Sequence, residues 1–514
     1  MKKLIQFVLT FCCIFVGNVA FSQQKTTYDI AYKFSVAELK ADLVTLKTQL
    51  EKVHTGLYVY HTKAEFDAYF QQLENSITEP MTDIEFHRLT FPLNKLIANG
   101  HTRPIPSIGY MDGVLFEWKI FPFEVYVDAG NLYVLKNLSD DETIVDGAII
   151  HSINGENAMA IYDSFVDQIW RDGFNKTAPQ TDGYESFSEW YAYLKGLPQT
   201  FEVELLQPNG EHLYLSLAAK SMEEMKTVKK ERYPNAKIDW EDDPTIKALA
   251  LEIDGQTATM TIRSWSEYDY KKKGQKKFKQ FFKQSFEAME QAEVEHLILD
   301  FRDNGGGDPV PTIELFAHLH PEPFTFYKAI TSNIGKIEDN ELYNISWFYR
   351  TMYKAGFKKE GDKYSINWIA NLFGIKGLKP SKPNKTIYDG KVYILTNADC
   401  FSATGEMTSI LKSYDRGVFI GEEPGGNPNT NTSGLQAVMT LPNTGNRVVM
   451  PFWQWEMNTT FENTGYGVKP DYPVRPTIQD MLDGRDVVME FTLDLIQKQA
   501  ATKATSEKEI LTKQ

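Results

Sequence analysis

Residues 297–307 read LILDFRDNGGG, an apolar run that ends in three consecutive glycines. The run has the length and composition of a buried strand, and glycines after a strand let the backbone turn its N–H groups toward a bound group. Such N–H groups can stabilise an oxyanion. A phosphate-binding loop also uses glycines, but it needs Gly-Lys-Ser/Thr, whereas Asp308 and Pro309 follow here. The segment therefore favours acyl chemistry over nucleotide binding.

A second segment places a serine at an expected strand-to-helix junction. Residues 392–395 form an apolar run, Ser402 follows, and helical spacing begins at Gly405. At such a junction the field of the helix N-terminus and the next backbone N–H can stabilise an oxyanion. Ser402 alone would more often be a helix cap. Together with the three glycines, it indicates a nucleophile.

Strand-like and helical runs alternate through the second half of the chain. We expect strands at 257–262, 297–299, 392–395 and 418–420, and helices at 276–288, 311–319 and 405–414. Alternation of this kind is typical of an α/β layer domain. The lysines of residues 271–283 are interleaved with phenylalanines at helical spacing, which indicates one buried and one solvated helix face instead of a nucleic-acid or membrane face.

The first half of the chain carries other patterns. Residues 36–49 and 63–77 have the apolar spacing of helices. Residues 123–127 and 132–135 are short β-rich runs separated by turn residues. The polar, charge-dense stretch 221–243 has the composition of a linker. These patterns predict a helical region, then a β domain, then a linker before the α/β domain.

Length and composition agree with several folded domains. At roughly 150 residues per domain, 514 residues predict about three domains. Apolar residues make up 42% and charged residues 24% of the chain, which is ordinary globular usage. Subtracting 69 acidic from 54 basic residues gives a net charge of −15, which argues against nucleic acid or an anionic membrane as the main partner. Only a local basic patch could reverse that conclusion.

Residues 1–22 have the features of a secretory signal. Two lysines precede the apolar run 4–19, and Ala-Phe-Ser at 20–22 offers a small-x-small cleavage site. The run is shorter than the ~20 residues that a spanning helix needs, and no later run reaches that length. We therefore expect an exported chain that does not span a membrane, periplasmic or secreted, whose charge becomes −15 − 2 = −17 once the two lysines are removed.

Cysteine usage agrees with that expectation. Cys12 and Cys13 would leave with the signal, so Cys400 would have no partner for an intramolecular disulfide. A lone thiol in an exported protein can be reactive. Cys400 precedes Phe401, however, and we interpret it as a small buried side chain.

Four motifs follow one another in the second half. They are Asp-x-Arg-x-Asn-Gly-Gly-Gly at 300–307, Ser-Ala at 402–403 with Glu406 in the first helical turn, Ile-Gly-Glu-Glu-Pro-Gly-Gly at 420–426, and Gly-Val-Lys-Pro-Asp at 467–471. This order resembles the tail-specific or C-terminal-processing protease family, over about residues 245–495. The family consists of serine proteases whose catalytic domain is similar to the ClpP–crotonase fold. The resemblance implies a peptide or protein substrate.

Residues 146–155 read DGAIIHSING and resemble the Gly-Asp-x-Ile-x-x-Ile-Asn-Gly segment of PDZ domains, with the first two residues inverted. The Asn-Gly pair predicts a tight hairpin turn. No clean carboxylate-binding Gly-Leu-Gly-Phe loop stands upstream. A ligand-binding PDZ-like domain and a purely structural β domain therefore have equal weight.

The resemblance offers two catalytic bases. The bacterial tail-specific branch uses a lysine downstream of its serine, but no lysine stands between Lys412 and Lys469, and Asn427 takes its approximate place. The tricorn-core-like branch uses an upstream histidine in a Gly-His-Thr motif, which residues 100–102 match. Imidazole has a pKa near neutrality and can take and return a proton. The resemblance therefore implies His101 as the general base.

A glutamate completes the tricorn-like pattern, in a Glu-Asn-x-Gly-Val-x-Pro-Asp stretch. Residues 462–471 carry that pattern with two extra residues, which implies that Glu462 supports His101. The alternative for Glu462 is a solvated loop carboxylate. The branch also has a serine just before its histidine, where Gly100 stands here.

Together these signs predict an α/β multidomain protein. Its expected parts are a signal peptide at 1–22, an N-terminal helical domain at 23–106, a PDZ-like β domain at 107–222, a ClpP/crotonase-like α/β catalytic domain at 223–497 and a polar tail at 498–514. Because the helical domain would supply His101, we expect the active site to form between domains.

The function hypothesis is an exported serine-type endopeptidase. Ser402 would be the nucleophile and His101 the base, with an oxyanion hole formed by Ala403, Gly306 and Gly307. The alternatives are a non-catalytic ligand-binding protein on the same fold and an esterase or amidase. We expect no metal or cofactor, because the chain has no His-Glu-x-x-His motif and no cysteine cluster.

Overall fold

The computed structural model describes residues 28–114, 118–236, 240–241, 243, 245–275, 277–338 and 341–511. The expected signal peptide, with Cys12 and Cys13, lies outside the described residues. The chain divides into two compact units. Unit 1 comprises Met1–Asn235, Tyr327–Ile375 and Thr430–Glu456, and unit 2 comprises Ala236–Phe326, Lys376–Asn429 and Met457–Gln514. Among the described residues, no helix has both the length and the apolar character needed to cross a membrane.

Unit 2 is built on one six-stranded sheet. In spatial order its strands are β10 (Leu249–Asp254), β11 (Thr257–Ile262), β12 (His296–Asp300), β16 (Lys391–Thr396), β17 (Val418–Gly421) and β20 (Tyr472–Pro473). β10 and β11 are antiparallel, and all later neighbours are parallel. The register places Asp300 beside Leu395. The loops that follow β12 and β16 therefore leave the same edge of the sheet, where α/β proteins bind ligands.

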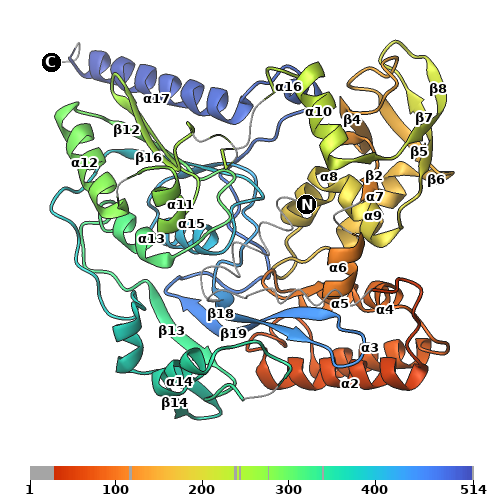
Figure 1. The fold of residues 1–514 in the computed structure, drawn as a ribbon. Helices are drawn as coiled ribbons and strands as arrows, with labels where there is room; N and C mark the ends of the chain where they lie inside the picture. The colour runs from red at the N-terminus through yellow and green to blue at the C-terminus, as the bar shows by residue number, and fades with distance from the viewer. Residues whose placement is uncertain are drawn as a thin grey trace. The chain divides into compact units, whose positions relative to one another are not determined.

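Helices cover both faces of this sheet (Figure 1). The helices of unit 2 are α11 (Glu267–Lys272), α12 (Phe278–Gln291), α13 (Pro309–Phe316), α15 (Ala403–Ser413), α16 (Ile478–Leu482) and α17 (Val487–Leu511). α17 covers one face, and its buried Val488 and Ile496 pack in a cluster with Ile298 and Leu395 of the strands. α12, α13 and α15 lie on the opposite face (Figure 1). The strands and helices expected in this half are therefore confirmed.

α12 also explains the basic segment. It buries Phe278, Phe282 and Phe286, while Lys279 and Lys283 are exposed. The interpretation as one buried and one solvated face is confirmed. Cys400 is buried, as its apolar neighbour indicates.

The first sheet of unit 1 joins distant parts of the chain. Its order is β1 (Arg103–Ile105), β19 (Arg447–Met457), β13 (Tyr327–Ser332), β15 (Lys363–Ile366) and β14 (Phe357–Glu360), with β18 (Thr430–Thr440) paired to β19. The helices near it in sequence are α2 (Val36–Val53), α3 (Lys63–Ser76), α4 (Asp83–Thr90), α5 (Leu93–Ile97), α6 (Ile108–Val114), α14 (Trp347–Gly356) and the short 3₁₀ helix η2 (Trp368–Phe373). Leucines 39, 43, 46 and 50 of α2 share a core with Met439, Met450 and Phe452.

The second sheet of unit 1 is antiparallel. It consists of β3 (Phe123–Asp128), β4 (Asn131–Asn137), β5 (Ile149–Ile153), β7 (Thr200–Leu206) and β8 (His212–Ala218), with β6 (Glu156–Asn157) on β5. The helices α7 (Ala158–Gln168), α8 (Thr177–Glu185) and α9 (Phe187–Leu194) pack on it. Asn154 and Gly155 have φ of 52° and 79°, so both adopt the left-handed conformation that a tight hairpin turn uses.

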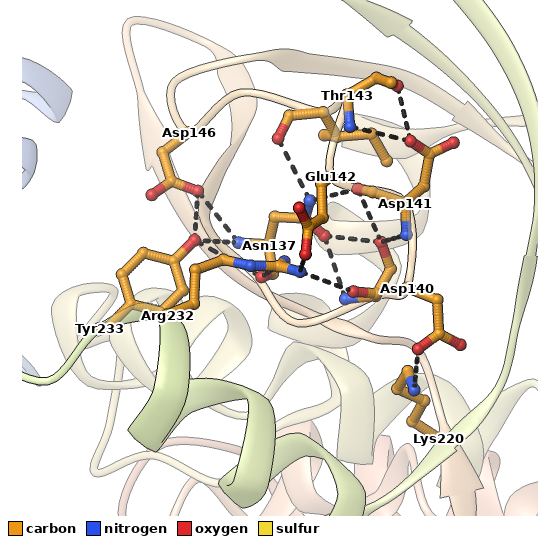
Figure 2. A network of polar contacts seen from close by, with 11 residues as sticks. Asn137, Asp140, Asp141, Glu142, Thr143, Asp146, Lys220, Arg232 and Tyr233 are labelled. Carbon is orange, nitrogen blue, oxygen red and sulfur yellow. Dashed lines mark hydrogen bonds and ion pairs between the residues drawn. The ribbon is translucent and has the colours of Figure 1, made fainter.

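The charge-dense stretch expected to be a linker contains a packed helix instead. β9 (Lys220–Ser221) pairs with β2 (Lys119–Ile120), and α10 (Met222–Arg232) begins with a capping box between Ser221 and Glu224. Its end is bound to the loop after β4, where Arg232 Nη1 donates to the Asn137 carbonyl (2.5 Å) and Tyr233 Oη donates to Asp146 (2.7 Å) (Figure 2). Charge density therefore marks the solvated face of a helix over residues 222–232, where the linker prediction was wrong, while the boundary between the two units follows at Asn235 and Ala236, within the predicted stretch.

Candidate active site

Ser402 stands at a strained turn between β16 and α15. Its φ of 54° and ψ of −122° are rare for a residue with a Cβ. The residue is buried, and its side chain makes no cap hydrogen bond to α15. Strained strand-to-helix turns of this kind present nucleophilic serines in hydrolases. The Ser402 side chain therefore does not cap α15, which was the alternative to a nucleophile.

The loop after β12 comes into direct contact with this turn. Gly306 has φ of 111°, and a Cβ added there would lie 2.7 Å from Ser402 Cβ and 2.8 Å from the Phe401 carbonyl oxygen. Such distances are far below van der Waals contact, so only glycine fits at this position. The structure therefore brings together two segments that are far apart in sequence.

The three expected oxyanion donors differ in their surroundings. The Gly306 N–H donates to Asn304 Oδ1 (3.0 Å) and is thus engaged within its own loop. Ala403 begins α15, so its N–H has no intrahelical acceptor. Among the described residues, neither the Ala403 N–H nor the Gly307 N–H makes a hydrogen bond. The N–H groups of Ala403 and Gly307 thus have no acceptor among the described residues, whereas that of Gly306 has one.

Asn304 is a structural residue that the sequence analysis did not single out. It is fully buried, and its Nδ2 donates to the Ile262 carbonyl (2.9 Å). Its own carbonyl accepts from the Phe401 N–H (3.2 Å). Asn304 therefore ties the glycine loop to β11 and to the turn of Ser402, and its only sequence cue is its place in the glycine motif.

A third loop supports the turn from the other side. The Gly425 N–H donates to the Cys400 carbonyl (2.9 Å), and a Cβ on Gly405 would lie 3.2 Å from the Gly426 Cα. Asn427, at the approximate place of the missing lysine, is buried and its Nδ2 donates to Asn463 Oδ1 (3.0 Å). The loop at 420–427 therefore has a packing role next to Ser402.

Glu462 belongs to a segment tied to that loop. The Phe461 carbonyl accepts from Asn429 Nδ2 (2.6 Å), which anchors the residue before Glu462. The Glu462 side chain itself is exposed, and it makes no hydrogen bond or ion pair with any other described residue. Its surroundings are therefore those of a solvated carboxylate in this structure.

His101 lies in unit 1, in a tight loop before β1. Its N–H donates to Asn99 Oδ1 (3.1 Å), and the preceding Gly100 N–H donates to Asp172 Oδ1 (2.7 Å). Arg103 returns to the loop, because its Nε donates to the Gly100 carbonyl (3.0 Å). The Arg103 guanidinium also lies 4.6 Å from the ring centroid of Trp170. Polar side chains thus hold the backbone around His101.

Burial controls the protonation of this histidine. Loss of solvation, with the positive charge of Arg103 as the second cause, lowers the pKa of His101 to about 3. The imidazole is therefore neutral at pH 7 and has a lone pair that can accept a proton.

A second buried histidine belongs to the same hydrogen-bonded group. Thr102 Oγ1 donates to Asn99 Oδ1 (2.9 Å) and lies 2.6 Å from His54 Nε2. Because the single hydroxyl proton goes to Asn99, the threonine accepts from the His54 Nε2–H. Burial lowers the pKa of His54 to about 4. His54 therefore supports the loop of His101 as a neutral donor.

His54 and Asp172 are not predicted as site residues from the sequence. His54 and Thr102 are 48 residues apart, and Gly100 and Asp172 are 72 apart, so neither pair forms a local motif. One weak cue existed for His54, because residues 54–56 are His-Thr-Gly and residues 100–102 are Gly-His-Thr.

In the part of the chain that the structure describes, no group of three or more His, Cys, Asp or Glu side chains is arranged to hold a metal ion.

Comparisons with known proteins concern the family and the fold. The profile of peptidase family S41 matches residues 256–474, which include the glycine loop, Ser402 and Glu462 but not His101. Mature CPAF is similar in structure, with a TM-score of 0.56 and 13% identity over 87% of this chain and 94% of that chain. Mature CPAF complexed with lactacystin has a TM-score of 0.58 and 14% identity over 91% of this chain and 98% of that chain. Identities this low show a common fold only. A search among curated proteins finds no match.

Proposed function

The chain belongs to peptidase family S41, a family of serine-type peptidases, and from that premise we propose that it is an exported endopeptidase that forms an acyl-enzyme at Ser402. The observation that carries the proposal is the close apposition of Gly306 to a strained Ser402. A strained backbone conformation at a non-glycine residue has a cost, and presentation of a nucleophile beside oxyanion donors explains why the strain is kept.

The proposed first step is acylation. Ser402 Oγ attacks the peptide carbonyl carbon while its proton passes to the imidazole of His101. The N–H groups of Ala403 and Gly307 stabilise the negative charge on the carbonyl oxygen. The C–N bond then breaks, and the imidazolium returns its proton to the leaving amine.

Deacylation repeats the sequence with water. His101 takes a proton from the attacking water, the ester bond to Ser402 breaks, and the serine regains its proton. His101 is neutral at pH 7, so its imidazole can accept a proton at the start of each half-reaction. No lysine is available between Lys412 and Lys469 to serve instead.

Glu462 is proposed as a supporting acid for His101. The proposal rests on its position in the Glu-Asn…Gly-Val-Lys-Pro-Asp stretch, since its carboxylate is exposed among the described residues. Stabilisation of an imidazolium by a solvated carboxylate is weak, so its share of the catalysis is expected to be small.

Export and the division into domains belong to the same proposal. The features of residues 1–22 support a cleaved signal, with a periplasmic or secreted product. The antiparallel sheet of β3–β5, β7 and β8, with its Asn154-Gly155 hairpin, supports a PDZ-like domain within residues 107–222. The nearby helices α2–α5 support a helical domain within 23–106.

The test combines peptide hydrolysis with covalent labelling by a fluorophosphonate probe. We expect Ser402→Ala to abolish labelling and Ser402→Ala and His101→Ala each to lower kcat/KM by at least about a thousandfold. Ser413→Ala, on the same helix, and His61→Ala are matched controls that should keep full activity. Because mature CPAF has been solved in complex with lactacystin, lactacystin is a useful second probe.

Other outcomes of this test would assign the chain a different function or mechanism. An unlabelled wild-type chain without hydrolytic activity would be a non-catalytic binding protein. Hydrolysis of esters but not of peptides would indicate an esterase. Full activity of His101→Ala would remove the proposed base while leaving Ser402 as the nucleophile.

A further inference from the structure

Three large aromatic side chains stand out on the surface of unit 1. Trp347 and Phe348 begin α14 and are 70% and 51% exposed, and Trp368 of η2 is 70% exposed. Exposure of two tryptophans and a phenylalanine is unfavourable in water, and such patches usually mark interaction sites. We refer to these three residues as the aromatic patch.

The elements that carry the aromatic patch make hydrogen bonds and ring contacts within unit 1. Asn367, next to Trp368, donates from its N–H to the Gly356 carbonyl (2.9 Å) and from Nδ2 to the Ala355 carbonyl (2.7 Å), at the end of α14. The opposite face of the helix is buried through Tyr353, whose ring stacks on Phe357 at 4.7 Å. Tyr353 therefore faces the core of the unit, whereas Trp347 and Phe348 of the same helix are exposed.

Unpaired lysines lie on the same elements. Lys354 is on α14, Lys358 and Lys359 are on β14, and Lys363 begins β15; all four are exposed. None of these four forms an ion pair with another described residue, and the acidic residues close by in sequence are Glu360 and Asp362. This local positive charge contrasts with the net charge of −15 for the whole chain.

We propose that α14, η2 and the β14–β15 hairpin bind the surface of an anionic lipid bilayer. Tryptophan and phenylalanine insert at the boundary between headgroups and acyl chains, while lysines reach the anionic headgroups with their apolar stems along the surface. Both kinds of side chain occur within residues 347–368, on neighbouring elements of unit 1. Because the whole chain has a net negative charge, binding to an anionic bilayer requires a local basic patch, and these lysines would provide it.

The positive charge of the four lysines favours an anionic bilayer over a second copy of this chain as the binding partner. In a symmetric dimer both partners would present the same patch, so two surfaces that each carry an excess of lysine would repel one another. Protein interfaces are depleted in lysine, whereas each lysine close to an anionic bilayer contributes about fivefold to binding. Single-stranded nucleic acid also combines lysine with aromatic stacking, and it is included in the test.

The experiment is co-sedimentation of the mature chain with vesicles. We expect binding to vesicles of phosphatidylcholine and phosphatidylglycerol in equal parts, little binding to phosphatidylcholine alone, and loss of binding at high salt. Replacement of the three aromatic residues by alanine, and of the four lysines by glutamine, should each weaken binding at least about tenfold. Trp347→Phe with Trp368→Phe should remove most of the blue shift in tryptophan fluorescence on binding.

Matched controls address unspecific effects. Tyr214→Ala removes an aromatic side chain that is 73% exposed on β8, and replacement of Lys271, Lys272, Lys279 and Lys283 by glutamine removes four charges from α11 and α12. Both controls should bind like the wild type. Circular dichroism and thermal unfolding establish that each variant is folded.

Three results would overturn the proposal. They are absence of wild-type binding to anionic vesicles, equal binding of the patch variants and their controls, and a change in oligomeric state by light scattering when the patch is removed. Tighter binding of single-stranded DNA than of vesicles would assign the patch to nucleic acid instead. The proposal is independent of peptidase activity, so Ser402→Ala should bind vesicles like the wild type.

Discussion

The loop that carries Ser402 and the loop that carries His101 are built in opposite ways. Ser402 is positioned by backbone strain and by the close approach of Gly306, where a side chain has no room. His101 is positioned by buried polar side chains, among them Asn99 and Asp172, which bind the backbone of its loop. The first loop is therefore sensitive to added atoms, and the second is sensitive to lost hydrogen bonds.

Gly306→Ala should have the largest effect, because it adds one methyl group at the most crowded point. The new Cβ would lie 2.7 Å from Ser402 Cβ, at a φ of 111° that is strained for any residue with a side chain. We expect the shifted Ser402 turn to lower kcat/KM by at least about a hundredfold, measured with a peptide substrate.

Gly130→Ala is the matched control for that variant. Gly130 has φ of 76° but nothing within 4 Å of an added Cβ, so it carries the strain without the clash. It should unfold about 1 kcal/mol more easily and keep its activity. Near wild-type activity of Gly306→Ala would show that the Ser402 turn tolerates displacement.

Asp172→Ala should have the next largest effect, on the histidine loop. It leaves the buried Gly100 N–H without its acceptor, which costs about 1–3 kcal/mol of unfolding free energy. Urea denaturation measures the loss. Asp167→Ala is the control, because Asp167 pairs with Lys95 at the exposed surface, where such pairs contribute about 0–1 kcal/mol. Equal losses in both variants would contradict the proposed role of Asp172.

His54→Gln should alter the dependence of stability on pH. Buried His54 and His101 have pKa values lowered to about 4 and about 3, below the usual value for an unfolded histidine. The unfolded chain therefore binds more protons, and stability is complete above about pH 6.5 and falls as the pH drops toward these values. Each histidine contributes a slope of up to about 1.4 kcal/mol per pH unit.

The glutamine variant removes one of those slopes and keeps an N–H donor for Thr102. We expect its stability to fall less steeply than that of the wild type between pH 6 and 4. Thermal unfolding at several pH values tests this. His212→Gln, at an exposed position on β8, is the control, and an unchanged slope in His54→Gln would contradict the burial argument.

Glu462→Gln should have the smallest effect. Its carboxylate is exposed and solvated, so we expect kcat/KM to fall by less than about tenfold, measured beside His101→Ala. A loss as large as that of His101→Ala would make Glu462 a full member of a catalytic triad and would bring the two loops under one mechanism.

Local patterns in the sequence were enough to predict most elements of the α/β half. The strands β11, β12, β16 and β17 and the helices α12, α13 and α15 lie where apolar periodicity predicts them, because that periodicity reflects which face of an element is buried. The helix α10 was mistaken for a linker, since it has only one buried residue, Met225. A helix with so small a buried face leaves almost no periodic signal.

Assignment of segments to a core depended on contacts far apart in sequence. Residues 327–375 and 430–456 fall within the expected catalytic domain, yet they belong to the compact unit of the helices and the antiparallel sheet. An apolar alternation marks a strand but does not say which sheet the strand joins.

In the candidate active site, too, some features follow from local sequence and others from contacts between distant residues. The three glycines and the serine before a helix are visible in the sequence because backbone freedom and helix starts depend on neighbouring residues. The apposition of Gly306 to Ser402 depends on the parallel register of β12 and β16, and the support of His101 depends on His54 and Asp172, which lie 48 and 72 residues from their partners. Hydrogen bonds and packing act between atoms in contact, so these long-range pairs exist only once the chain has folded.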